Sequence, residues 1–174
     1  MRISVETIKE LRNMTSAGIA QCKKALEETG GDLKKAAAWL RKQGLEIAAK
    51  RQALGAKEGR VEGYVHAGNK IGALIEVNCE TDFVARNEEF ARFCKDLAMQ
   101  VAAMNPAYIK GEDVPESVLG QEKNKELFLK EHCLLEQPFI KDAGTTIKDY
   151  LGTLLSKFSE NISIRRFTRY KIGE

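Results

Sequence analysis

The chain has 174 residues, of which 43% are hydrophobic and 30% are charged, and its net charge is +3. This composition is typical of a globular protein with one domain, or with a small module and a medium one. No apolar run approaches the roughly 18 residues of a membrane-spanning helix, the first residues lack the apolar block of a secretion signal, and the charge is too small for a dedicated nucleic-acid binder. We therefore expect a cytoplasmic protein, or an organellar one if a presequence has been removed, that contacts neither membrane nor nucleic acid directly.

Residues 4–43 predict three short helices joined by tight turns, because apolar residues recur at helical spacing in each. The predicted N-caps are Ser4, Thr15 with Ser16, and Asp32. Gly44 is predicted to end the third helix. A bundle of about 45 residues is near the lower size limit for an independent core, and Trp39 is either its largest core residue or an exposed contact.

Gly18 stands at the start of the second predicted helix. Glycine costs roughly 1 kcal/mol of helix propensity relative to alanine, so its presence requires a reason. Either another protein approaches closely here, or the glycine packs tightly against the first helix. Residues 1–58 hold 12 Lys and Arg against 7 Asp and Glu, and this excess favours an acidic partner surface.

Residues 46–60 are basic and alanine-rich and are predicted to link two modules. Beyond them, 61–66 and 71–79 predict a β-hairpin that turns at Gly68 and Asn69. One face of the second strand is uniformly apolar, with Ile71, Ala73, Ile75, Val77 and Cys79. That face is expected to be buried.

Two helices and a closing strand are predicted in the remainder. Asn87 is the predicted cap of a helix at 88–104, and Thr146 is the predicted cap of the last helix. Residues 161–172 predict a strand whose alternation is interrupted, which indicates a bulge.

These elements predict an α+β fold. A three-helix module is expected at 1–45, a linker at 46–60, and a core of antiparallel sheet with helices at 61–174.

The connection between the second strand and the next helix, at 78–87, contains a large aromatic residue and a branched aliphatic one, Phe83 and Val84. Connections are normally polar and exposed. These two side chains therefore either turn back to cap the core, or form a protruding tip with Asp82 that binds another protein.

Signatures of catalysis are absent from the sequence. Its glycines match neither the dinucleotide-binding nor the P-loop pattern, and four widely spaced cysteines do not form a zinc motif. His132 beside Cys133 is a weak indication of a thiol–imidazole pair, since adjacent residues rarely point toward one another. We therefore expect a binding protein rather than an enzyme, with no cofactor and no bound metal.

Four segments resemble, in the same order, the bacterial elongation factor Ts family. The segment 77–87 is similar to its signature, and 10–26, 137–142 and 160–167 are similar to its N-terminal module, a core segment and the closing strand. This agreement extends nearly end to end and matches the short form of the family.

The resemblance implies a guanine-nucleotide exchange factor for elongation factor Tu. It implies that the first three helices form a ubiquitin-associated-like docking module, that Phe83 enters the partner near its nucleotide pocket, and that Asp82 disturbs the region holding Mg²⁺. The implied partner-binding residues are Gly18, Ile19 and Lys23 in the docking module, Thr81, Asp82, Phe83 and Val84 in the tip, and His66 on the hairpin.

The chain departs from the family pattern in three respects. Where the family often has two methionines, it has Ile19 and Ala20, and it is shorter between Gln121 and Leu134. It also has one strand-pair-plus-helix unit where long members have two. A single unit leaves a sheet edge open, and self-association would cover that edge, so we expect a homodimer.

Two other functions compete with nucleotide exchange. One is a three-helix binding module for ubiquitin-like or ribosome-associated partners, which would work without residues 81–84. The other is a thiol enzyme that uses Cys133 with His132.

Overall fold

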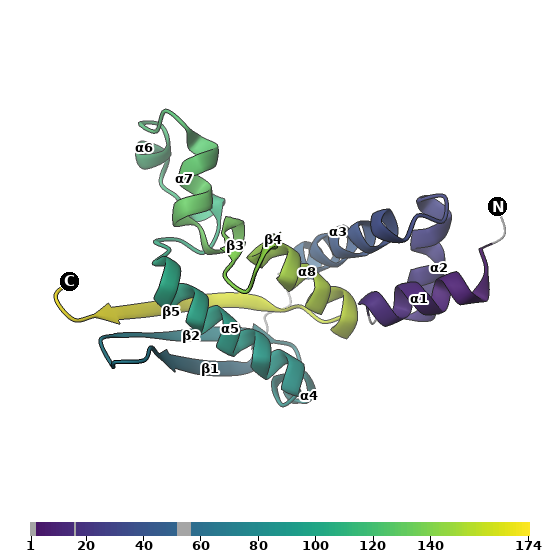
Figure 1. Cartoon of the computed structure of the whole chain (residues 1–174), viewed down its shortest axis with the longest axis horizontal. Coiled ribbons are helices and arrows are strands. Elements are labelled where there is room, and N and C mark those ends of the chain that lie inside the picture. The colour runs from purple at the N-terminus through teal and green to yellow at the C-terminus, as the bar shows by residue number, and fades with distance from the viewer. Residues whose placement is uncertain (1–2, 16, 52–56) are drawn as a thin grey trace. The chain divides into compact units, whose positions relative to one another are not determined.

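The computed structural model describes residues 3–15, 17–51 and 57–174 (Figure 1). Three N-terminal helices are followed by an antiparallel sheet with helices, which confirms the predicted α+β class. Within the described part of the chain, no helix has the length and apolar character needed to cross a membrane.

Contacts divide the chain into two units. The helical unit comprises Met1–Gly55 with Leu151–Ile162, and the sheet unit comprises Ala56–Tyr150 with Ser163–Glu174. The module boundaries expected from the sequence stay a prediction, and residues 52–56 of the expected linker lie outside the described residues.

The helical unit is built from α1 (Val5–Thr15), α2 (Ile19–Glu28) and α3 (Leu33–Arg51). Their apolar faces meet in one cluster of buried residues, which are Leu11, Ala17, Cys22, Ala25, Leu26, Ala36 and Leu40. Trp39 is half-buried against this cluster, and the Nζ of Lys24 lies 6.0 Å from its ring centre. The tryptophan is thus a peripheral part of the core.

Of the caps predicted for α1, α2 and α3, two are confirmed and one is wrong. Ser4 Oγ accepts from the N–H of Thr7 at 3.1 Å, and Asp32 Oδ1 accepts from the N–H of Lys35 at 3.0 Å. Thr15 instead belongs to α1, where its hydroxyl donates to the carbonyl of Leu11 at 2.8 Å. Since that hydroxyl turns back into its own helix, α2 begins without it. Ser16 lies outside the described residues.

The expectation that Gly44 ends the third helix is also wrong, because α3 continues to Arg51. Gly44 is buried, and a Cβ there would lie 3.0 Å from the carbonyl oxygen of Gly152 in α8 (Ile147–Phe158). Next to it, Ser156 Oγ donates to the carbonyl of Leu40 at 2.7 Å. Glycine here permits two helices to approach closely, so its role is in packing.

The sheet unit contains three antiparallel strands in the order β1 (Glu58–Val65), β2 (Ile71–Cys79) and β5 (Ser163–Lys171). α5 (Glu88–Met104) lies along one face of this sheet (Figure 1). The apolar face of β2 is buried as predicted at four positions, Ala73, Ile75, Val77 and Cys79, while Ile71 is half-buried. The register between β2 and β5 shifts between Glu76 and Val77, which confirms the predicted bulge.

The segment between α5 and α8 is made of short elements. It contains η2 (Gly111–Asp113), α6 (Glu116–Leu119), α7 (Lys125–His132), η3 (Leu134–Glu136), and a short hairpin of β3 (Pro138–Phe139) and β4 (Asp142–Thr146). The hairpin is held by a buried polar network. Gln100 Nε2 donates to Gln137 Oε1 and to the carbonyl of Pro138, both at 3.1 Å, and Ile140 N donates to Gln100 Oε1 at 3.0 Å.

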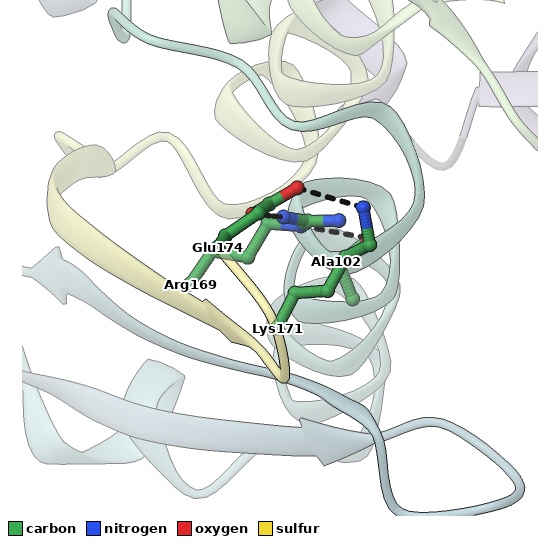
Figure 2. A network of polar contacts seen from close by, with 4 residues as sticks. All are labelled: Ala102, Arg169, Lys171 and Glu174. Atoms are coloured by element: carbon green, nitrogen blue, oxygen red, sulfur yellow. Dashed lines mark hydrogen bonds and ion pairs between the residues drawn. The ribbon is translucent and has the colours of Figure 1, made fainter.

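The C-terminal end of α5 is capped by a side chain from β5. Arg169 Nε donates to the carbonyl of Ala102, in the last turn of α5, at 3.0 Å (Figure 2). Glu174 accepts from Arg169 Nη1 at 2.7 Å and from Lys171 Nζ at 2.8 Å. Cations near a helix C-terminus satisfy carbonyls that have no partner within the helix, so this network fastens β5 to α5.

Replacing Gly44 by alanine is expected to lower the free energy of unfolding by about 1–3 kcal/mol, the usual cost of overpacking. The added Cβ would lie 2.6 Å from Ser156 Oγ and 3.0 Å from a backbone oxygen, so the serine or the helix must move. Urea denaturation followed by circular dichroism measures the loss. Gly63→Ala is the control, since its Cβ meets only ordinary contacts, the nearest at 3.6 Å. Equal stability of both variants and the parent would contradict the packing role.

Candidate partner-binding site

The site develops where the central strand ends. β2 finishes at buried Cys79, whose Sγ donates to the carbonyl of Thr81 at 3.2 Å. Thr81 has an extended backbone (φ −124°, ψ 153°), and its Oγ1 accepts from the N–H of Val84 at 3.5 Å. This is the arrangement of an N-cap threonine. It begins a one-turn helix, α4 (Asp82–Ala85).

A second cap follows immediately. Asn87 Oδ1 accepts from the N–H of Glu89 at 2.9 Å and begins α5, which confirms the predicted cap. Between the caps, the N–H of Arg86 donates to the carbonyl of Asp82 and that of Asn87 to the carbonyl of Val84, both at 3.0 Å. Because backbone groups along this connection are paired, the turn is a defined structure between two larger elements.

The two apolar side chains of this turn point in different directions. Val84 is 7% exposed, whereas Phe83 is 83% exposed. Consecutive residues of a helix are about 100° apart, so burying Val84 directs its neighbour outward. The alternative in which Phe83 caps the core is therefore wrong. Of the four expected tip residues, Val84 faces the protein's own interior, Phe83 is exposed, and Thr81 and Asp82 are half-buried.

Sequence reasoning missed one charged residue of the tip. Arg86 Nη2 lies 3.3 Å from Asp82 Oδ2, and the two side chains are 82% and 47% exposed. Oppositely charged residues four positions apart on a helix are neighbours. The spacing of Asp82 and Arg86 in the sequence could therefore have predicted the ion pair, but only if the helix at this position were already known.

The docking residues expected in the helical unit lie at the N-terminal end of α2, where Ile19 and Lys23, four positions apart, are on the same side of the helix. Gly18 is the exposed N-cap of α2, and Ile19 in the first turn is 58% exposed. Lys23 follows one turn later, with its Nζ 3.9 Å from Glu27 Oε1. Among the described residues, a Cβ on Gly18 would meet only the side chain of Gln21, at 3.5 Å. Gly18 is therefore not packed against α1, and the close-packing explanation is wrong.

His66 lies far from the tip within the sheet unit. It follows β1 and shares a hydrogen bond of 3.0 Å between its Nδ1 and the hydroxyl of Tyr64. The β1–β2 ladder runs from the pair of Glu58 and Cys79, next to the tip, to the pair of Val65 and Gly72, next to His66. Eight paired positions at the rise of a strand separate the two by roughly 25 Å. His66 and the tip are thus separate candidate contacts.

The geometry is unfavourable to a thiol enzyme. Cys133 is fully buried, and burial together with the nearby Glu136 carboxylate raises the pKa of its thiol. A raised pKa disfavours the thiolate that acts as nucleophile. The neighbouring imidazole of His132 packs instead against the ring of Phe128, with ring centres 4.4 Å apart and ring planes tilted by 37°.

Comparison with known proteins gives consistent results over the whole chain. Two stretches, 4–127 and 124–174, match the family described as Elongation factor TS. The chain is similar to "Elongation factor Ts" of Carboxydothermus hydrogenoformans (46% identity, covering 99% of this chain and 90% of the relative). It is also similar to "Elongation factor Ts" of Caldanaerobacter subterraneus subsp. tengcongensis (48% identity, covering 99% of this chain and 98% of the relative). A third relative is that of Thermodesulfovibrio yellowstonii (47% identity, covering 100% of this chain and 98% of the relative).

The comparisons also bear on the shortened segment. The alignment with the Thermodesulfovibrio protein has 196 positions and covers the 174 residues of this chain, so about 22 positions have no counterpart here. The two family matches meet at 124–127, inside the stretch that the sequence indicated as short. The match nevertheless extends to both sides of that point. The chain therefore belongs to the elongation factor Ts family.

Proposed function

We propose that this chain, an elongation factor of translation by its family, binds elongation factor Tu and accelerates the release of GDP from it. The observation that carries the proposal is the 83% exposure of Phe83 on a turn with caps at both ends. Large aromatic side chains are the usual anchors of protein interfaces. Here the anchor stands beside an acidic residue, Asp82, in the order that the family signature has.

The proposed mechanism is a disturbance of the partner's nucleotide site. Phe83 enters between elements of the partner next to the bound GDP, and this brings Asp82 to the region that holds Mg²⁺. The metal offsets much of the negative charge of the diphosphate, so loosening it weakens the binding of GDP. Because coupling between two ligands is reciprocal, GDP weakens the binding of the factor by the same factor.

Docking is assigned to the N-terminal end of α2. Gly18 has no side chain and admits close approach of the partner, Ile19 offers exposed apolar surface, and Lys23 offers a positive charge. These residues hold the complex together, while the tip acts on the nucleotide. His66 supplies a further contact at the other end of the hairpin.

The rival interpretation as a three-helix module for ubiquitin-like or ribosome-associated partners would use the same end of α2. It gives no reason for an exposed phenylalanine in the sheet unit. Exposure of Phe83 thus favours nucleotide exchange.

A second copy of the chain is proposed as a further partner. The face of the sheet opposite α5 carries exposed apolar side chains, which are Val61, Val65, Leu74 and Tyr170. β1 and β5 are the edges of this sheet. An apolar face with open edges favours association, and symmetric stacking of the two sheets in a homodimer would cover the apolar face.

Phe83→Ala and Asp82→Ala are each expected to slow GDP release from elongation factor Tu at saturating concentrations of the chain. Loss of an anchor side chain costs about 2 kcal/mol, equivalent to roughly 30-fold in rate. Stopped-flow fluorescence of a labelled GDP measures the rate constant of GDP release. Met104→Ala is the control, because Met104 is 41% exposed at the far end of α5. Unchanged release in both tip variants, with folding intact, would refute the mechanism.

The homodimer is tested by light scattering after size exclusion at several micromolar concentrations. The wild-type chain is expected at twice the mass of one chain, and Leu74→Glu is expected as a monomer because it places a charge on the apolar face. Lys123→Glu, at an exposed position before α7 and outside that face, is the control and should remain dimeric. A monomeric mass for the wild-type chain throughout this range would rule the dimer out.

A further inference from the structure

Asp82 and Arg86 are joined twice across the tip. The backbone N–H of Arg86 donates to the carbonyl of Asp82 at 3.0 Å, and Arg86 Nη2 lies 3.3 Å from Asp82 Oδ2. The backbone bond closes the single turn of α4, and the ion pair lies on its surface. Asp82 Oδ1 is not part of this pair.

The ion pair contributes little to holding the turn together. Its side chains are 82% and 47% exposed, and exposed pairs stabilise a fold by at most about 1 kcal/mol. The turn is secured by other groups, namely the caps Thr81 and Asn87 and the buried side chain of Val84. A charged pair that the fold does not require stands next to the most exposed large apolar residue among those described, Phe83.

The pair does restrict the carboxylate of Asp82. A free aspartate side chain on a surface samples several rotamers, each of which is lost on binding. With one oxygen against the guanidinium, the carboxylate is held on the α4 surface and its second oxygen stays available. The guanidinium also offsets the negative charge of Asp82, which would otherwise be repelled by the phosphates of a bound nucleotide.

We propose that Arg86 is a positioning residue for nucleotide exchange, which orients the Asp82 carboxylate beside Phe83 before the tip enters the partner. This inference rests on the proposed function of the tip. Arg86 acts through Asp82 and makes no required contact with the partner. Its effect on exchange therefore disappears when Asp82 is removed.

The test is a double-mutant cycle in the full-length chain. The rate constant of labelled-GDP release from elongation factor Tu is measured at saturating concentrations of the wild type, Arg86→Ala, Asp82→Ala and the double variant. Arg86→Ala is expected to slow release by about two- to fivefold, the range for an exposed ion pair. Adding Arg86→Ala to Asp82→Ala is expected to cause no further loss.

The variant Arg86→Lys separates orientation of Asp82 from a purely structural role of Arg86, because a structural role alone would not link the GDP release rate to the shape of the cationic group. Lysine keeps the charge and lacks the planar fork of the guanidinium, so it should restore part of the lost rate. The thermal midpoints of the variants and their half-saturating concentrations should stay close to wild type. Glu89→Gln, which alters a nearby charge outside the pair, is the matched control and should release GDP at the wild-type rate.

Three results would overturn the inference. An equal loss from Arg86→Ala with and without Asp82 would mean that Arg86 contacts the partner itself. Faster GDP release with Arg86→Ala than with the wild type would mean that the ion pair hinders Asp82. Unchanged release with Arg86→Ala would mean that the orientation of Asp82 does not limit the rate. Failure of the proposed function gives a different result, in which neither Asp82→Ala nor Phe83→Ala slows GDP release. In that case the role inferred for Arg86 is refuted as well.

Discussion

Burial of Val84 is the contact on which the geometry of the tip depends. In a helix of one turn, the neighbour of a buried residue has little choice of direction, so anchoring Val84 in the sheet unit turns Phe83 to solvent. Thr81 is the N-cap of α4, and Asn87 is the N-cap of α5, which follows it. The result is an aromatic side chain presented by a preorganised backbone, which lowers the entropy cost of binding.

Much of the framework around the tip was predictable from the sequence. The alternation in β2 identified its buried face because a strand has a period of two, and the caps Ser4, Asp32, Asn87 and Thr146 were predicted because short polar side chains there can pair with a free backbone N–H. Each of these signals is local. The tip was also predicted, but from its resemblance to a family signature.

The errors arose where distant contacts decide the structure. Gly44 is a helix-ending residue by local rules, yet it lies inside α3 because α8 packs against it. The β3–β4 hairpin depends on Gln100, 37 residues before Gln137 in the chain. The direction of the Phe83 side chain was left undecided by the sequence, because a helix of one turn is too short to show a repeating apolar face. The burial of its neighbour Val84 decides that direction.

The proposed role of the chain is to loosen a nucleotide held by another protein. The most direct measurement is the release of labelled GDP from purified elongation factor Tu, chased with excess unlabelled GDP, as the wild-type chain is titrated in. We expect a release rate that rises with the concentration of the chain and then saturates, together with displacement of the chain from the complex by excess GDP. A release rate independent of the chain, in a mixture where binding is detected separately, would contradict it.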